Sequence, residues 1–262
     1  MLSGKVALVV GGTSGIGRAA AVALGRAGAR VAVAGRSAEG GAGTVALVAA
    51  AGGSALFAPL DVDQPDHFDR AGEQILAALG PVDIGVNAAG RVNSGNTGTM
   101  VDQTPEDFDA VFTTNARGVW LAMRLELRQM LAHGRGGAIV NVSSASAFRG
   151  TFGGGFYSSS KHAVEGLTKS AAIEFADRKI RVNGVAPGPT RTPMLESVLS
   201  AEALAAAGAV RPMRRIGTPE EVADVIVFLV SDAARYVTGE TIRMDGAARH
   251  LPAIGVLPDR AR

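Results

Sequence analysis

Short, continuously apolar runs alternate with helix-patterned segments along most of this 262-residue chain. The run Val6–Val10 is apolar at every position, as is typical of a strand buried on both faces. Similar runs predict strands at residues 6–10, 30–34, 55–59, 82–86, 138–142, 180–185 and 240–244. Because helical patterns separate these runs, we expect a single-domain, doubly wound α/β fold with a parallel sheet of about seven strands and helices on both faces.

The helical patterns cover residues 18–27, 38–51, 65–79, 105–133 and 156–176, and a further capped helix opens at Thr218. Residues 105–133 predict one long helix or two, with Trp120 packed in the core. We assign residues 1–248 to the domain, with a substrate cover near 190–216, and residues 249–262 to a C-terminal tail.

Composition supports this organisation and narrows the function classes. With 47% hydrophobic and 19% charged residues, the chain has enough apolar material for a large core. Its net charge of +2 does not favour nucleic acid as a partner. It contains no cysteine, so disulfides and thiol catalysis are excluded. With no signal-peptide pattern and no long apolar run, we expect a soluble, cytoplasmic protein that does not enter membranes; the histidines lack metal-ligand spacing, so we expect no metal.

A glycine-rich turn, Gly11-Gly-Thr-Ser-Gly-Ile-Gly17, lies between the first predicted strand and the first predicted helix. Glycines in this position let the backbone approach a pyrophosphate, which the N-terminus of the helix then stabilises. A glycine turn by itself is weak evidence, but this strand-turn-helix context is the one that the motif requires. The turn therefore predicts a dinucleotide cofactor on a Rossmann-type domain.

The end of the second predicted strand bears on which dinucleotide is bound. An acidic residue there would hold the ribose hydroxyls of NAD, whereas an arginine suits the 2′-phosphate of NADP. Arg36 stands at this position and no acid does, which favours NADP(H). NAD(H) remains possible, because Arg36 would then only stack on the adenine or face water.

Tyr157 and Lys161 are four residues apart on a predicted helix and therefore share one face. A nearby ammonium favours the phenolate form of a tyrosine, which would make Tyr157 an acid/base at neutral pH. Ser144 follows the strand at 138–142 and could hold a substrate oxygen within reach of the phenol. Taken alone, the Tyr/Lys pair could equally be an ordinary surface pair.

Together these residues resemble the short-chain dehydrogenase/reductase family over roughly residues 3–247. Gly11 stands where that family usually has threonine. The motifs that match, in order, are Gly11–Gly17, Asp61-Val62, Asn87-Ala-Ala-Gly90, Asn115, Ser144, Tyr157 with Lys161, and Pro187-Gly188.

The resemblance implies a role for each matching residue. Tyr157 would be the acid/base, Lys161 would lower its pKa and bind the nicotinamide ribose, Ser144 would orient the substrate oxygen, and Asn115 would hold a water in a proton relay. It also implies a homotetramer built from the helices near 105–133 and 156–177. The residues implied in cofactor binding, besides Arg36, Tyr157 and Lys161, are Gly11, Gly12, Ser14, Ile16, Gly17, Asp61, Val62, Asn87, Gly90, Pro187, Gly188, Thr190 and Thr192.

The expected function is NAD(P)-dependent hydride transfer between nicotinamide and a small-molecule secondary alcohol or ketone. One alternative is a 3-oxoacyl carrier-protein reductase, in which Arg211, Arg214 and Arg215 would meet a phosphopantetheine; Ile173, where such members often carry arginine, counts against it. Another is a non-catalytic dinucleotide-binding protein. We expect residues 91–99, 145–156 and 190–216 to line the substrate pocket, whose small, apolar stretch at 151–156 suggests an uncharged substrate.

Overall fold

The computed structural model describes residues 2–92 and 98–248, so the proposed tail and part of segment 91–99 lie outside the described residues. Within them, seven strands form one parallel sheet in the order β3-β2-β1-β4-β5-β6-β7, which confirms the predicted fold class. The strands are β1 (Val6–Val10), β2 (Arg30–Gly35), β3 (Ser54–Pro59), β4 (Ile84–Asn87), β5 (Gly137–Val142), β6 (Ile180–Pro187) and β7 (Thr241–Met244).

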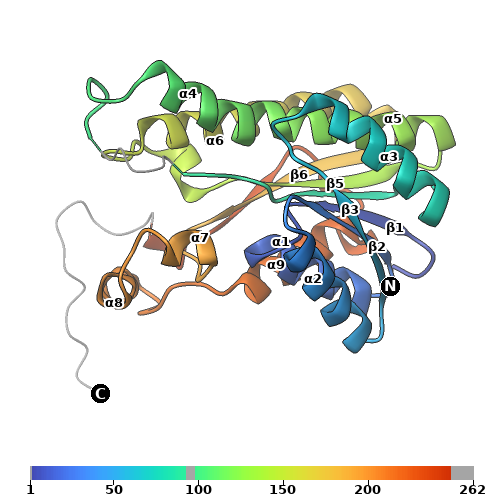
Figure 1. Cartoon of the computed structure of the whole chain (residues 1–262), viewed down its shortest axis with the longest axis horizontal. Helices are drawn as coiled ribbons and strands as arrows, with labels where there is room; N and C mark the ends of the chain where they lie inside the picture. Colours follow the sequence, from blue (N-terminus) through green and yellow to red (C-terminus); the bar gives the residue numbers. More distant parts are fainter. Residues whose placement is uncertain (1, 93–97, 249–262) are drawn as a thin grey trace.

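Helices cover both faces of the sheet (Figure 1). One layer consists of α1 (Gly15–Arg26), α2 (Ala38–Ala50) and α9 (Pro219–Val230). The other consists of α3 (Pro65–Leu79), α4 (Pro105–Phe112), α5 (Gly118–His133) and α6 (Gly155–Phe175). The short helices α7 (Pro193–Glu196) and α8 (Ala201–Ala209) follow β6 and lie beyond the end of the sheet. No helix within the described ranges is both long and apolar enough to cross a bilayer.

The apolar strands form two cores, one on each face of the sheet. Side chains of Val6, Leu8 and Val10 enter the core beneath α3, α5 and α6. Those of Ala7 and Val9 enter the core beneath α1 and α9. Because successive strand residues point to opposite faces, an uninterrupted apolar run is the sequence that buries β1 on both sides.

Several predicted boundaries are confirmed and others are wrong for identifiable reasons. The helix predicted at 65–79 has those bounds. The strand predicted at 82–86 begins instead at Ile84, because the N–H of Val82 donates to the Gln129 side chain on α5. Trp120 does not lie in the core: it is 47% exposed on α5, where the guanidinium of Arg124 lies 5.9 Å from its ring centroid.

A π-helical turn, Thr113–Arg117, separates α4 from α5 within the segment predicted as one or two helices. Such a turn adds a residue to the helical repeat and changes the direction in which the following side chains point. Asn115 lies inside it and is fully buried. Such turns are frequent at functional sites, and this one contains Asn115, a residue to which the sequence motifs assign a role.

A carboxyl group is buried in the core between β4 and α5. Glu126 is fully buried, and its Oε2 atom accepts a hydrogen bond from the Asn87 side-chain amide at 3.2 Å. The amide of Asn87 also donates to Asn141 on β5, which in turn donates to Thr168 on α6. A Cβ atom on Gly85 would collide with the Glu126 carboxyl, so this glycine makes the space that Glu126 occupies.

Burial raises the pKa of Glu126 to about 8, against a smaller opposing effect of the hydrogen bond from Asn87. In the unfolded chain the same carboxyl loses its proton near its ordinary pKa of 4.5. The unfolded state therefore releases the proton first, and the free energy of unfolding should fall as pH rises from about 4.5 to about 8, by up to about 1.4 kcal/mol per pH unit.

We predict that Glu126→Gln removes this decline, because the glutamine keeps the shape and the acceptor but cannot ionise. Chemical denaturation at several pH values between 5 and 8 measures the effect. Glu174→Gln, at an exposed position on α6, is the matched control and should leave the decline in place. An unchanged pH dependence in Glu126→Gln would contradict a buried, protonated carboxyl.

Candidate active site

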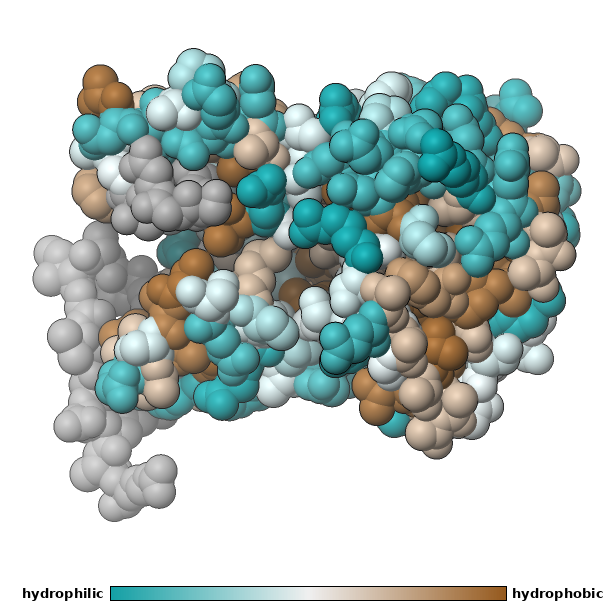
Figure 2. Space-filling view, in the orientation of Figure 1, coloured by the Kyte–Doolittle hydropathy of each residue, from teal (hydrophilic) through white to brown (hydrophobic). Residues whose placement is uncertain are grey.

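A cavity of about 630 Å³ opens where the strands end. The space-filling view shows this face hollowed between the two helical layers (Figure 2). The turns that follow β1, β2, β3, β4, β5 and β6 all contribute to its lining, as expected for a ligand site in an open α/β sheet. The predicted site residues that line it are Gly11, Ser14, Ile16, Gly17, Arg36, Asp61, Val62, Gly90, Ser144, Tyr157, Lys161, Pro187, Gly188, Thr190 and Thr192.

Three predicted site residues lie behind the lining. Gly12 packs on the sheet, where an added Cβ would be 3.0 Å from Val33. Asn87 directs its amide into the buried network with Glu126. Asn115 is enclosed by the chain around it. Their contacts with a cofactor or a relay water therefore stay predictions.

The glycine turn is close-packed and its helix end is open. Gly11 has a φ of 81°, and a Cβ there would lie 2.5 Å from the backbone nitrogen of Ala89, so the threonine usual at this position could not replace it without a shift of the backbone. A Cβ on Gly17 would collide with the carbonyl oxygen of Gly11. Helix α1 begins at Gly15. The side chain of its N-cap residue, Ser14, makes no capping hydrogen bond, and the first turn contains no acidic residue. Its N-terminal N–H groups and dipole are thus suited to the pyrophosphate of a dinucleotide.

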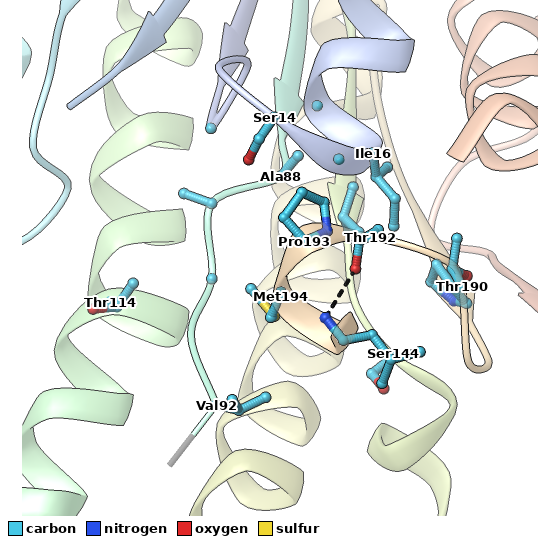
Figure 3. A pocket seen from close by; sticks show the side chains of 18 of the residues that line it. Ser14, Ile16, Ala88, Val92, Thr114, Ser144, Thr190, Thr192, Pro193 and Met194 are labelled. Atoms are coloured by element: carbon cyan, nitrogen blue, oxygen red, sulfur yellow. Dashed lines mark hydrogen bonds between the residues drawn. The ribbon is translucent and has the colours of Figure 1, made fainter. Parts of the chain in front are cut away.

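The cover closes one side of the cavity. Thr192 lies beside the glycine turn, and its methyl group would be 3.3 Å from a Cβ on Gly15. Figure 3 shows Ser14 and Ile16 at one end of the cavity and Ser144 and Val92 at the other, with Thr192, Pro193 and Met194 between them. The hydroxyl of Thr192 also accepts the N–H of Leu195 and so caps α7. The predicted cover thus contributes lining residues directly.

Ser144, Tyr157 and Lys161 converge on the cavity from β5 and the first turns of α6. Burial raises the pKa of Tyr157, while a hydrogen bond with Ser144 opposes the rise. The Lys161 ammonium lies 5.9 Å from the centroid of the Tyr157 ring. In the protein alone, therefore, the phenol is protonated at neutral pH, in contrast to the expected lowering of its pKa by Lys161.

Lys161 is 4% exposed and donates a hydrogen bond to the carbonyl oxygen of Val142 at 2.9 Å. Burial lowers its pKa to about 8, and the nearby Glu165 carboxylate opposes this effect. A lysine with a pKa near 8 is still mostly charged at neutral pH, but it can exchange its proton far more readily than an exposed lysine. Such a poised group beside a phenol is characteristic of a catalytic site.

Asn115 links α6 to the turn after β4. Its amide nitrogen donates to the Arg91 carbonyl oxygen at 2.9 Å and to the Ser160 hydroxyl at 3.0 Å, and its carbonyl oxygen accepts the Arg91 N–H at 2.8 Å. Ser160 directly precedes Lys161. Asn115 therefore holds the residue next to the lysine and the residue after Gly90 in fixed positions.

Sequence reasoning missed other side chains that line the cavity. Thr114, on the π-helical turn, donates a hydrogen bond at 2.7 Å to Asp63, which lies just before α3. Both residues line the cavity. Arg149 lines the cavity from the segment 145–156, which was expected to line the substrate pocket, although its side chain was not singled out. The proximity of Thr114 to Asn115 was a usable signal, whereas nothing in the local pattern indicated where Arg149 would point.

Comparisons with known proteins agree with this geometry. A family model described as "Enoyl-(Acyl carrier protein) reductase" matches residues 10–247. A 2,5-dichloro-2,5-cyclohexadiene-1,4-diol dehydrogenase of Sphingobium indicum is 38% identical over 247 residues, covering 94% of this chain and 97% of the relative. A 3-oxoacyl-[acyl-carrier-protein] reductase of Thermotoga maritima is 39% identical over 245 residues, covering 94% and 98%.

Solved structures of related proteins match the fold of this chain over most of its length. A short-chain type dehydrogenase/reductase from Mycobacterium marinum superposes with a TM-score of 0.88 at 38% identity, covering 94% of this chain and 96% of its own. An actinorhodin polyketide ketoreductase with NADPH gives a TM-score of 0.88 at 34% identity, covering 94% and 98%. On the combined evidence of motifs, fold and relatives, this chain belongs to the short-chain dehydrogenase/reductase family and is an oxidoreductase that acts on CH–OH and C=O groups.

Proposed function

We propose that this enzyme uses NADP(H) to interconvert a small-molecule ketone and its secondary alcohol, with Tyr157 as the acid/base. The observation that carries the proposal is the convergence of Ser144, Tyr157 and Lys161 in one cavity. Ser144 lies at the end of this cavity opposite to the glycine turn (Figure 3). The dinucleotide, when bound, supplies or accepts the hydride.

The proton step follows from the environment of Tyr157. Because burial keeps the phenol protonated, Tyr157 can donate its proton to the oxygen of a carbonyl that accepts a hydride. Ser144 orients that oxygen. The Lys161 ammonium stabilises the phenolate that remains, and Asn115 holds the hydroxyl of Ser160, the residue before the lysine, and the backbone of Arg91. These roles favour reduction at neutral pH and run in reverse for alcohol oxidation at higher pH.

The preference for NADP(H) rests on Arg36. This arginine lines the cavity just after β2, is exposed, and has no hydrogen-bond or ion-pair partner within the described part of the chain. Its neighbours along the chain, Gly35 and Ser37, carry no charge. An uncommitted guanidinium at this point of a dinucleotide site suits a 2′-phosphate. The ketoreductase with NADPH shares the fold at 34% identity, which is consistent with this choice.

We also propose a homotetramer that associates through the outer faces of α5 and α6. Trp120 and Leu131 on α5 are 47% and 41% exposed, and Ile173 on α6 is 82% exposed. Exposed large apolar side chains on the surface of a protein are characteristic of an interface.

Tyr157→Phe should bind NADPH as the native enzyme does and lose carbonyl reduction by about 10²–10⁴-fold, because the ring remains and only the transferable proton is removed. Steady-state reduction of a panel of simple ketones, together with NADPH fluorescence titration, measures both properties. Tyr236, the other tyrosine of the chain, is fully exposed, and Tyr236→Phe is the matched control. Full activity in Tyr157→Phe would refute this mechanism.

Arg36→Ala should weaken NADPH binding by roughly tenfold and leave NADH binding almost unchanged, since only NADPH carries the phosphate that the guanidinium would contact. Side-by-side fluorescence titrations of both nucleotides test this. Arg26→Ala, at an exposed site on the last turn of α1, serves as the control for loss of a positive charge. Tighter binding of NADH than of NADPH by the native enzyme would show that Arg36 is not a phosphate contact.

A further inference from the structure

Three arginines lie close to the segment that follows Ser144, and we call Arg149, Arg211 and Arg243 the arginine cluster; of the three, Arg149 lines the cavity. Arg149 lines the cavity together with Ser144 and Tyr157. The guanidinium carbon of Arg243 on β7 lies 3.6 Å from the ring centroid of Phe148, the residue before Arg149. Arg211 is close enough to Arg149 to sense its charge. The cluster therefore joins β7, the segment after β5 and the segment after α8.

The backbone of Arg149 is held by the catalytic helix. The hydroxyl of Ser158 is shared between the carbonyl oxygens of Ser146 and Arg149, at 2.5 and 2.7 Å. Ser158 is the residue directly after Tyr157 and is itself 5% exposed. The turn of α6 that carries Tyr157 therefore also holds the backbone of Arg149.

Two arginines that follow Arg211 in the cover are committed to the protein, whereas one donor atom of Arg211 is not. Arg215 forms an ion pair with Glu221, and Arg214 donates to the carbonyl oxygen of Ala209 at 2.9 Å. The Nε atom of Arg211 is buried and has no hydrogen-bond partner among the described residues. A buried donor on a charged group is costly to leave unpaired, so this atom favours an acceptor supplied from outside the chain.

The charges around Arg211 do not balance. Burial lowers its pKa most, repulsion from Arg149 lowers it further, and the Asp245 carboxylate, which is 8% exposed, raises it. Among the described residues, the charges that act on Arg211 are thus one arginine and one carboxylate, and Arg243 adds a further positive charge beside Phe148. Like charges held together are stabilised when an anion binds between them, and guanidinium groups suit carboxylate and phosphate oxygens in particular.

We propose that the arginine cluster binds an oxyanion of the substrate, a carboxylate or a phosphate carried by the oxo compound at a distance from its reacting carbonyl. This inference rests on the proposed function, because it assigns the substrate class of the same cavity. The proposed anionic substrate replaces the uncharged one suggested by the apolar stretch at 151–156. That stretch is not among the residues that line the cavity, whereas Arg149, which precedes it, is, and would anchor the charged end.

Two substrate pairs, each assayed with NADPH, test the proposal. The first pair is a straight-chain oxo acid and its methyl ester. The second is acetoacetyl pantetheine thioester with and without its 4′-phosphate. We expect the native enzyme to show at least about tenfold higher kcat/KM for the anionic member of one pair, mostly through a lower KM, because a remote anchor binds the ground state and the transition state alike. The pair that shows the preference identifies the oxyanion as carboxylate or phosphate.

Arg149→Gln and Arg211→Gln should each remove most of that preference and leave kcat/KM for the neutral member within about twofold. Arg178→Gln removes an exposed arginine just before β6, at the end of the strands opposite to the cavity, and should retain the preference. Thermal melting and NADPH titration of each variant exclude misfolding. Equal kcat/KM for the charged and neutral members of both pairs, or a preference that persists in both variants, would overturn the proposal.

Different results would contradict the proposed function and the proposed role of the arginine cluster. If neither member of any pair nor any simple ketone is reduced, the proposed function itself is wrong. If neutral ketones are reduced as well as their anionic counterparts, the proposed function stands and the arginine cluster has no role in substrate binding.

Discussion

The contact between the turns after β1 and β4 is the constraint on which the site depends. These strands are neighbours, yet the chain leaves β1 for α1 on one face of the sheet and leaves β4 for the helices on the other. The divergence opens the cavity at their carboxyl ends, and it forces the two turns together at their base. Gly11 lies against the backbone of Ala89 there, and Gly17 lies against Gly11, so both positions require glycine as the backbone stands.

Helix α6 holds the reacting groups through the neighbours of Tyr157 more than through the tyrosine itself. Ser158 fixes the segment after β5, Ser160 meets Asn115 on the π-helical turn, and Lys161 bonds to the last residue of β5. One turn of helix thereby connects three parts of the chain. The phenol is left with a hydrogen bond to Ser144, so its proton remains available to a substrate oxygen.

The sequence predicted the fold because hydrophobic patterning follows local rules, and the proposed reacting groups were inferred from rules that are equally local. A continuously apolar run indicates a doubly buried strand, a glycine turn between strand and helix indicates a dinucleotide site, and a spacing of four places Tyr157 and Lys161 on one face. Features that depend on distant partners could not be predicted. Trp120 is apolar but lies on the outer face of α5, and Glu126 is charged in sequence but buried, because Gly85 on another strand leaves space for it.

The distribution of positive charge along the cavity explains how one site could take two anionic ligands. Arg36 follows β2 and Arg149 follows β5, and in the sheet these strands are separated by β1 and β4. Three inter-strand spacings of about 4.8 Å place the two turns roughly 14 Å apart. That distance exceeds the Debye length of about 8 Å at physiological ionic strength, so a phosphate at one end and an oxyanion at the other would repel each other only weakly. Lys161 also lines the cavity, bonded to the end of β5, and its positive charge favours anionic ligands.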